Sequence, residues 1–266
     1  MLVQIKSPGN RRTKLVRKLQ TRKGRTEERR FVAEGRNLVT EILERGLDVD
    51  FIMVPESLLS ERRSGTADLI ESCIGSPDIT LCAVPDREFE RLTDAGEGIG
   101  MLAVVRMREY GAETVRALPP GSNLLVLDRI QDPGNLGTLV RTAAAAGYGA
   151  VLAMSGTADL WSPKVLRATA GTVFAIPFIA VKDTEELREM TAGRRLAVTA
   201  VEGGRPYYRE NLREGIALVI GNESRGVSPE IMEMADVRVT LPMKGGVESL
   251  NAASAAAILM YEAVRQ

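Results

Sequence analysis

The chain has 266 residues, of which 44% are hydrophobic and 26% are charged. This is the composition of an ordinary globular protein, and the length suits two domains or one large one. No apolar run approaches the roughly 18 residues of a membrane span, and the basic N-terminus lacks the apolar region of a signal peptide. We therefore expect a soluble cytoplasmic protein with no membrane association.

The chain contains no histidine and only two cysteines, Cys73 and Cys82. The absence of histidine excludes Ser-His-Asp and Cys-His nucleophile systems, a histidine general base and histidine-ligated zinc. The two cysteines have neither metal-ligand spacing nor the number that a disulfide framework needs. Any chemistry must therefore use carboxylate, Arg, Lys, Ser, Asn or backbone groups, and we expect no metal site.

Positive charge is concentrated at the N-terminus. Residues 1–30 contain eleven Lys or Arg and two acids, a net charge of +9 in a chain whose total is zero. Such asymmetry predicts a polyanionic partner, and a short helix with Leu15, Val16 and Leu19 on one face and cations on the others favours RNA or DNA. The alternative is a solvated basic helix that binds nothing specific. The cations expected to contact nucleic acid are Arg11, Arg12, Lys14, Arg17, Lys18, Arg22, Lys23 and Arg25.

The first 108 residues predict a compact α/β domain with no catalytic cluster, so a binding role is favoured. Its expected helices are 36–45, 67–74 and a short one opening at Pro85, and its expected strands are 51–54, 79–84 and 101–105. Residues 109–121 are the expected linker, because they lack a clear pattern and include Pro119-Pro120-Gly121, which breaks regular structure.

The second domain, residues 122–266, alternates strands with helices. The expected strands are 124–127, 150–153, 175–179, 196–201, 217–220 and 237–241, and the expected helices are 138–146, one after Ser162-Pro163, 184–191 and 250–265. Alternation of this kind predicts a parallel sheet with helices on both faces.

Three polar, glycine-bearing loops follow strands in this domain, at 128–137, 221–227 and 241–251. Ligands bind at the carboxyl ends of parallel strands, where backbone groups are free and glycine permits close approach. Any one loop is an ordinary connection, but the three together favour a site. Arg141 lies on the first turns of the helix after the first loop, where the helix dipole disfavours a cation, so it indicates an anionic ligand; a surface salt bridge is the alternative.

In this order the three loops resemble the three motifs of the SpoU (TrmH) family of RNA 2′-O-ribose methyltransferases, within the SPOUT class. The matching residues are Asn135, Gly137, Arg141 and Gly147, then Gly221, Glu223 and Gly226, then Pro242, Met243, Gly245, Ser249, Leu250, Asn251 and Tyr261-Glu262. Residues 7–10 with the basic helix, and residues 31–43, are similar to the L30e-like domain of many members. The chain departs from the family at Ala144, where Asp is frequent, and at Ala252-Ala253, where Val-Ser is common.

The resemblance implies an α/β chain with a C-terminal SPOUT domain, whose parallel sheet carries helices on both faces and a deep trefoil knot. A small N-terminal α/β (L30e-like) domain would bind the RNA substrate. The resemblance also implies a homodimer through the C-terminal domain and S-adenosyl-L-methionine as cofactor. The residues implied to bind the cofactor, mostly through backbone atoms, are Ala200, Gly221, Asn222, Leu241, Met243, Ser249 and Leu250.

The implied catalytic residues are Asn135, Arg141, Glu223, Ser249 and Asn251. The family's proposal makes Arg141 the base, but arginine stays protonated in proteins, so binding an RNA phosphate and stabilising the developing alkoxide is the safer role. The other four residues would orient Arg141 and the ribose. For Glu223 and Asn251 the alternative is loop capping.

Three functions compete. An RNA ribose methyltransferase is favoured, with 23S ribosomal RNA preferred to transfer RNA and base methylation disfavoured. A non-catalytic RNA-binding protein that keeps the fold is opposed by the intact catalytic set, and a dehydrogenase-like enzyme is opposed by the absence of a G-x-G-x-x-G turn after an early strand. The target nucleotide, and whether the role is housekeeping or antibiotic resistance, stay open.

Overall fold

The computed structural model describes residues 1–60, 65–93, 100–243, 245 and 249–266, so positions 244 and 246–248 of the third loop lie outside the described residues. The chain forms two compact units. The first comprises Met1–Arg108 and Trp161–Gly171, and the second comprises Glu109–Leu160 and Thr172–Gln266. The sequence had assigned Trp161–Gly171 to the C-terminal domain, whereas in the structure this segment clusters with the first unit.

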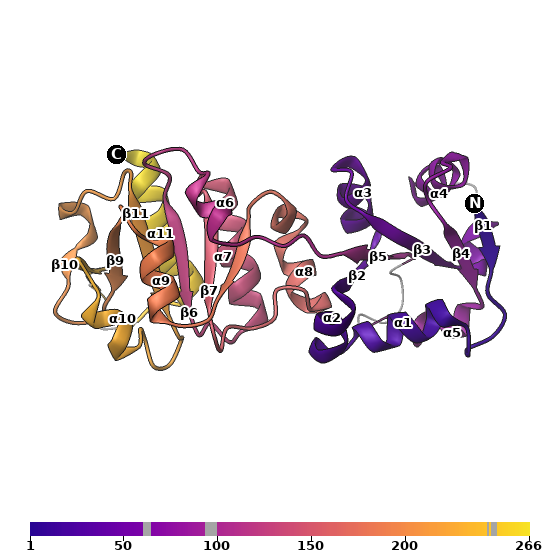
Figure 1. The fold of residues 1–266 in the computed structure, drawn as a ribbon, viewed down its shortest axis with the longest axis horizontal. Helices are drawn as coiled ribbons and strands as arrows, with labels where there is room; N and C mark the ends of the chain where they lie inside the picture. The colour runs from indigo at the N-terminus through magenta and orange to yellow at the C-terminus, as the bar shows by residue number, and fades with distance from the viewer. Residues whose placement is uncertain (61–64, 94–99, 244, 246–248) are drawn as a thin grey trace. The chain divides into compact units, whose positions relative to one another are not determined.

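The first unit is a five-stranded mixed sheet with the order β1-β4-β3-β5-β2, in which β5 runs antiparallel to β3 and β2 (Figure 1). Figure 1 draws α1 and α5 on one side of this sheet and α3 and α4 on the other. Its elements are β1 (Leu2–Gln4), α1 (Arg11–Leu19), α2 (Arg22–Glu28), β2 (Arg30–Glu34), α3 (Arg36–Glu44), β3 (Val49–Pro55), η1 (Glu56–Leu59), α4 (Gly65–Gly75), β4 (Leu81–Val84), α5 (Asp86–Glu90), β5 (Leu102–Arg106) and α8 (Pro163–Thr169).

The basic helix α1 is held on the sheet by its apolar face. Asn10 caps it by accepting a hydrogen bond from the backbone N–H of Arg12, and Val16 and Leu19 are buried among core residues of β3 and β5. Leu15 is only half-buried, so the predicted apolar stripe is narrower than expected. Strands β1 and β2 had no counterpart in the sequence prediction. Strand β1 has only three residues, and β2 is buried along nearly its whole length and lacks the alternation of a half-exposed strand.

The segment Trp161–Gly171 makes two specific contacts within the first unit. The Trp161 ring stacks on Phe31 of β2, with centroids 4.7 Å apart and planes at 22°. Arg167 of α8 pairs with Glu34 at 2.9 Å, and the Glu34 side chain is fully buried. Aromatic stacking and a buried ion pair fix the segment against β2 more firmly than an exposed contact would.

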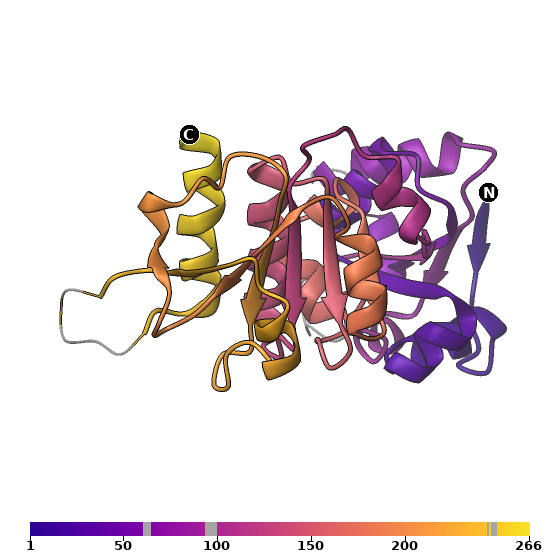
Figure 2. The ribbon, with the colours of Figure 1, turned by 60° about the vertical axis from the view of Figure 1, so that its left-hand side comes forward.

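The second unit is a seven-stranded sheet with the order β10-β12-β9-β11-β6-β7-β8, and all its pairings are parallel, as the alternation predicted. Figures 1 and 2 show α7 and α11 on one face and α6 and α9 on the other, which confirms the two-faced arrangement. Its elements are α6 (Ala112–Arg116), β6 (Leu124–Asp128), α7 (Pro133–Ala145), β7 (Ala150–Met154), η2 (Thr172–Phe174), β8 (Phe178–Val181), α9 (Thr184–Met190), β9 (Arg195–Thr199), β10 (Arg205–Pro206), η3 (Tyr207–Arg209), β11 (Ile216–Gly221), α10 (Pro229–Glu233), β12 (Val237–Thr240) and α11 (Ala252–Arg265).

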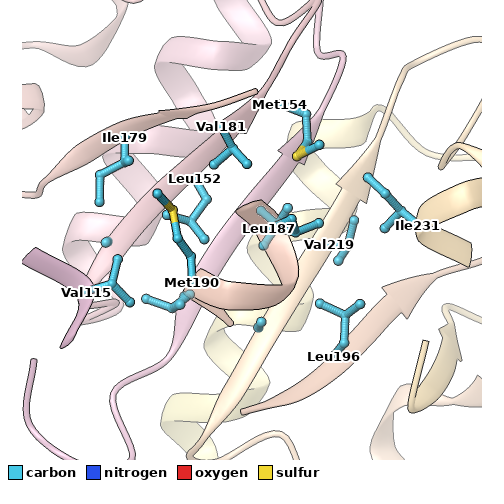
Figure 3. Packing of buried hydrophobic residues seen from close by; sticks show 14 of the residues in the cluster. Val115, Leu152, Met154, Ile179, Val181, Leu187, Met190, Leu196, Val219 and Ile231 are labelled. Atoms are coloured by element: carbon cyan, nitrogen blue, oxygen red, sulfur yellow. The ribbon is translucent and has the colours of Figure 1, made fainter. Parts of the chain in front are cut away.

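The expected linker is partly structured. Residues 112–116 form α6, and Val115 is buried beside Met190 of α9 in the core that covers one face of the sheet (Figure 3). Ile231 of α10 packs at the other end of the same core. The linker prediction was wrong at this point because a single buried valine in a short segment leaves no readable helical period.

The parallel register brings the site loops to one edge. Gly221 at the end of β11 lies opposite Asp128 at the end of β6, and β9 and β12 run alongside in the same direction. The first, second and third loops therefore all leave the carboxyl edge of this sheet. The trefoil knot implied by the family resemblance stays a prediction. Among the described residues, no helix is long and apolar enough to cross a membrane and no group of His, Cys, Asp or Glu is arranged to hold a metal ion.

Candidate active site

The first loop is shorter than the sequence predicted. Helix α7 begins at Pro133 rather than near 138, because Asp132 caps it by accepting a hydrogen bond from the backbone N–H of Asn135 at 2.7 Å. Proline at the first helical position and an aspartate cap are favourable helix-start signals. Asn135 therefore lies in the first turn of α7, where its side chain is oriented by a helix rather than by a loop.

The second loop is a tight turn between Asn222 and Gly226, whose backbones exchange hydrogen bonds of 3.0 and 2.9 Å. Gly226 has φ of 67°, a left-handed conformation that favours glycine. At Gly221 a Cβ would lie 2.3 Å from the backbone of Gly226 and of Val227, so no larger residue fits there. The two glycines are thus required by the shape of the turn itself.

Side chains from all three loops form one chain of hydrogen bonds. Asn251 donates through Nδ2 to Oδ1 of Asn135 at 2.9 Å, and Asn135 donates through Nδ2 to Oε1 of Glu223 at 3.0 Å. Glu223 also accepts from the backbone N–H groups of Gln131 and Asp132, at 3.4 and 3.3 Å. The structure therefore brings three of the expected catalytic residues together.

Two of these residues cap loops as well. The Glu223 carboxylate closes the β6–α7 loop through Gln131 and Asp132, and Oδ1 of Asn251 accepts from the backbone N–H of Ala253 and Ser254 at the start of α11. Capping and the inter-loop network use different atoms of Asn251. The capping alternative is therefore true, and it is compatible with a role in the site.

The environment of Glu223 favours its charged form. Partial burial raises the pKa of this carboxyl, but the hydrogen bonds from Asn135 and from the backbone of Glu223, Asp132 and Gln131 outweigh that effect and hold the pKa below its ordinary value. An ionised Glu223 is an acceptor only, which fixes the orientation of the Asn135 amide. Its low pKa makes it a poor general base.

Arg141 is not part of this network within one chain. It is exposed on α7, six residues after Asn135, which places it roughly 9 Å along the helix axis and on a different side of the helix. Its side chain makes no hydrogen bond or ion pair to another described residue, so the salt-bridge alternative has no support in the described part of the chain. Ser249 is also exposed, and a mouth shared by Arg141 and Asn135 stays a prediction.

The proposed cofactor positions lie at the same edge. Ala200, Gly221 and Leu241 follow or end the neighbouring strands β9, β11 and β12, and the side chains of Met243 and Leu250 are exposed. Backbone groups beside exposed apolar side chains suit a ligand with an adenine ring and an amino-acid tail, so these residues fit S-adenosylmethionine. The N–H of Ala200 donates to the carbonyl of Val239 at 2.9 Å, so that donor is already used.

Asn222 has a different role from the one expected. Its Nδ2 donates to the carbonyl of Arg129 at 2.8 Å and its Oδ1 accepts from the N–H of Ser224 and Arg225, each at 3.1 Å. Its own N–H and carbonyl are bonded to Gly226. Because every polar group of Asn222 is engaged within the loops, we withdraw it from the cofactor set and assign it to the shape of the turn.

The expected RNA-contacting cations of the first unit differ in their environments. Arg11, Lys14, Arg17, Lys18, Arg22 and Lys23 are all exposed. Of these, Arg17 pairs with Glu88, Lys18 pairs with Glu27 and Glu28, and Lys23 lies 3.8 Å from the Glu27 carboxylate. Arg12 is half-buried with its guanidinium 5.8 Å from the centre of the Phe51 ring. Arg25 is only 4% exposed and donates to the carbonyl of Leu19 at 2.7 Å, so we remove it from the RNA set.

Sequence reasoning missed the pair Asp128 and Arg129 at the end of β6. Asp128 is 2% exposed, and its carboxylate accepts from Arg129 and from the backbone N–H of Ser228. Both residues had been quoted only as part of the first loop. An acid directly after a run of buried strand residues was the available signal, since a carboxylate there must find partners when it is buried.

Comparisons with known proteins are consistent across sequence and structure. Residues 122–261 match the family model described as the SpoU rRNA methylase family, and residues 10–103 match the MRM3-like substrate binding domain. The 23S rRNA (guanosine(2553)-2′-O)-methyltransferase RlmP of Bacillus subtilis is 36% identical over 97% of this chain and 98% of that protein.

Solved structures agree with the sequence matches. An AdoMet-bound rRNA methyltransferase from Sinorhizobium meliloti superposes with a TM-score of 0.84 at 28% identity, covering 99% of this chain and 98% of that one. The SpoU methyltransferase AviRb from Streptomyces viridochromogenes, in complex with AdoMet, gives a TM-score of 0.81 at 26% identity, covering 97% of this chain and 98% of that one.

The lowered pKa of Glu223 predicts a pH-dependent contribution to stability. A carboxyl whose pKa is lower in the folded state stabilises the fold above its unfolded pKa of about 4.3, and this stability is lost as the pH falls through the folded pKa. At neutral pH we expect Glu223→Gln to lower the free energy of unfolding by up to about 1 kcal/mol, because the group is partly exposed. In urea titrations from about pH 7 to about pH 3, the difference in free energy of unfolding between the variant and the parent should approach zero at the acid end.

Glu202→Gln is the matched control for this measurement. Glu202 is exposed in the loop after β9, so its substitution should change the free energy of unfolding by less than about 0.5 kcal/mol throughout. A gap for Glu223→Gln that stays constant down to the acid end would contradict the assigned network.

Proposed function

Because the chain belongs to the SpoU rRNA methylase family, we propose that it transfers a methyl group from S-adenosylmethionine to a ribose 2′-hydroxyl of RNA at the carboxyl edge of its parallel sheet. The observation that carries this proposal is the hydrogen-bond chain from Asn251 through Asn135 to Glu223, which ties the three motif loops into one constellation. These three side chains come from three separate loops and are among the residues that the family resemblance implies for catalysis, which supports a catalytic site at this edge.

The chemistry needs little beyond position and charge. Bound S-adenosylmethionine supplies an electrophilic methyl group on a sulfonium. The asparagines and Glu223 orient the polar surroundings of the reacting hydroxyl, and orientation supplies much of the rate in such a transfer. The guanidinium of Arg141 would bind the phosphate beside the target ribose and stabilise the developing alkoxide. The oxygen–methyl bond forms as the sulfur–methyl bond breaks, the hydroxyl proton passes to solvent water, and the neutral thioether S-adenosylhomocysteine leaves.

We propose 23S ribosomal RNA as the substrate. The support is the likeness to RlmP along nearly the whole of both chains, together with a first unit that matches the MRM3-like substrate binding domain and carries an exposed row of cations on α1 and α2. Such a substrate implies that the protein works in the cytoplasm. Fractionation of cells that express the tagged chain would test this, and a signal confined to the membrane fraction would contradict it.

We also propose a homodimer through the second unit. Helix α11 exposes an apolar stripe in which Ile258, Tyr261 and Val264 are 40%, 49% and 57% exposed, while its opposite face packs in the core. An exposed stripe of large apolar side chains on a helix is typical of a protein–protein contact. Helix α7, which carries Arg141, packs against α11, so a second copy seated on this face would lie near that cation.

The dimer predicts a change in molecular mass on charge insertion. Tyr261→Glu should convert the dimer to a monomer in size-exclusion chromatography with light scattering, because burying an unpaired carboxylate disfavours the interface. Glu185→Lys on α9, which covers the other face of the sheet, should leave the mass of the parent unchanged. If the unsubstituted protein is monomeric at micromolar concentration, the dimer proposal is contradicted.

The reaction itself is tested with labelled S-adenosylmethionine and, separately, unmodified 23S ribosomal RNA and transfer RNA, followed by nucleoside analysis. We expect label on a 2′-O-methyl nucleoside of the ribosomal RNA. Arg141→Ala should lower kcat by about 10²- to 10³-fold, the usual effect of losing one transition-state donor, with cofactor binding retained. Arg188→Ala on α9 is the control and should keep the parent rate.

Several outcomes of this assay would contradict the proposal. Label on a base would change the reaction, and label on transfer RNA alone would change the substrate. If Arg141→Ala transfers methyl groups as fast as the parent protein, Arg141 has no role in the reaction. Absence of cofactor binding would leave only the RNA-binding function.

The exposed cations of the first unit predict the salt dependence of RNA binding. Each phosphate contact contributes roughly 0.7 to 0.9 to the slope of log affinity against log salt. Replacing Arg11, Lys14, Arg22 and Lys23 together by Gln should therefore reduce that slope by about three and weaken binding to all RNAs similarly. Lys182→Gln, an exposed lysine of the second unit, is the control. An unchanged slope in the fourfold variant would show that RNA binds elsewhere.

A further inference from the structure

The end of β6 carries a buried carboxylate with three donors. Oδ2 of Asp128 accepts from the backbone N–H of Ser228 at 2.6 Å, and Arg129 donates to Oδ1 through Nε at 3.0 Å and to Oδ2 through Nη2 at 3.3 Å. A buried carboxylate is stable only when its charge is compensated, and the adjacent arginine supplies that charge. Ser228 directly precedes α10 and follows the second loop, so this contact fixes the far end of that loop.

Arg129 itself has an uncommon backbone conformation. Among the described residues, only Arg29, Arg129 and Ala170 combine a positive φ with a side chain, and φ of Arg129 is 59°. This conformation costs free energy for any residue except glycine and, to a lesser degree, asparagine. A cost of this kind persists only where surrounding contacts hold the residue in place.

The contacts that hold Arg129 also hold the second loop. The carbonyl of Arg129 accepts from Nδ2 of Asn222 at 2.8 Å, which fixes the near end of the loop. The side chain of Arg129 lies against Gly156, where a Cβ would come within 3.1 Å of its Cγ. The turn that presents Glu223 is therefore anchored at its start through Arg129 and beyond its end through Asp128.

We propose that Asp128 and Arg129 form a positioning pair for the methyl-transfer site, acting through the turn that carries Glu223 rather than on the substrate. The proposal rests on the proposed function, since it names what aligns that same site. Glu223 orients Asn135, so a shift of the turn moves the amides that face the ribose. The cations proposed to bind RNA are Arg141 and those of the first unit, so we expect RNA affinity to be independent of the Asp128–Arg129 pair.

A simpler explanation assigns no function to the arginine and treats position 129 as a left-handed residue that happens to be tolerated. The two explanations predict opposite results for Arg129→Gly. Glycine is the residue best suited to a φ of 59°, so the substitution keeps the backbone conformation while removing the guanidinium. If conformation alone matters, the variant will match the parent.

The decisive experiment measures methyl transfer by Arg129→Gly, Asp128→Asn, the double variant and Arg129→Lys. We expect kcat to fall about ten- to a hundredfold in each single variant, the scale of a small misalignment, while the KM for RNA stays within about twofold. The double variant should be no slower than the slower single variant, because the two residues act as one unit. Lysine keeps the charge and should restore part of kcat.

Arg116→Ala provides the matched control, since it removes an exposed ion pair with Glu189 in the same unit and should leave kcat unchanged. A parent kcat for Arg129→Gly would overturn the proposal. A double variant that falls to the product of the two single effects would overturn it as well, because the residues would then act independently.

A second measurement does not depend on activity. Amide hydrogen exchange of the segment 219–229 should be faster in Arg129→Gly and Asp128→Asn than in the parent, because both variants disrupt the Arg129–Asp128 pair and so loosen the bond from Asp128 to the N–H of Ser228. If the parent transfers no methyl group, the proposed function fails while exchange still decides whether the pair holds the loop. Exchange identical to that of the parent in both variants would refute the positioning role.

Discussion

The site depends on the register between two parallel strands. Strands β6 and β11 are neighbours in the middle of the sheet, and they end level with each other, with Asp128 opposite Gly221. Chain segments separated by nearly a hundred residues therefore leave the sheet at the same point. The carboxylate of Glu223 can reach the backbone of the β6–α7 loop only because of this alignment, and a slip of one residue would turn every side chain of either strand to the other face.

Side chains at a few positions join the three loops. The first two loops are joined by hydrogen bonds that the carboxylates of Glu223 and Asp128 accept and that the Asn222 amide donates, so they form one preorganised surface. In the described part of the third loop, Asn251 provides the link to this surface, at the point where α11 begins. The surface formed by the first two loops holds Glu223 and Asn135 in place, and Asn251 meets it through the Asn135 amide.

Much of this arrangement could be read from the sequence, and the failures have physical causes. The alternation of strands and helices predicted the parallel sheet, and the resemblance to the three SpoU motifs implied that Asn135, Glu223 and Asn251 share one site, because both signals are carried by local patterns. Helix α6 was missed since one buried valine specifies it. The burial of Arg25 and the commitment of Asn222 to its turn could not be predicted, because both depend on which backbone carbonyls lie nearby in three dimensions. Arg141 matches an arginine of the family motif, but the side of α7 on which it lies is set by the residue at which the helix begins.

The segment Trp161–Gly171 limits how this protein can be divided. The chain passes between its two units three times, after Arg108, after Leu160 and after Gly171, so no single cut separates them into complete pieces. A fragment ending at residue 108 would lack the ring that stacks on Phe31 and the cation that neutralises Glu34. The segment also holds the sole tryptophan of the chain, so the intrinsic indole fluorescence of the whole protein reports on the first unit and not on the unit that carries the active site.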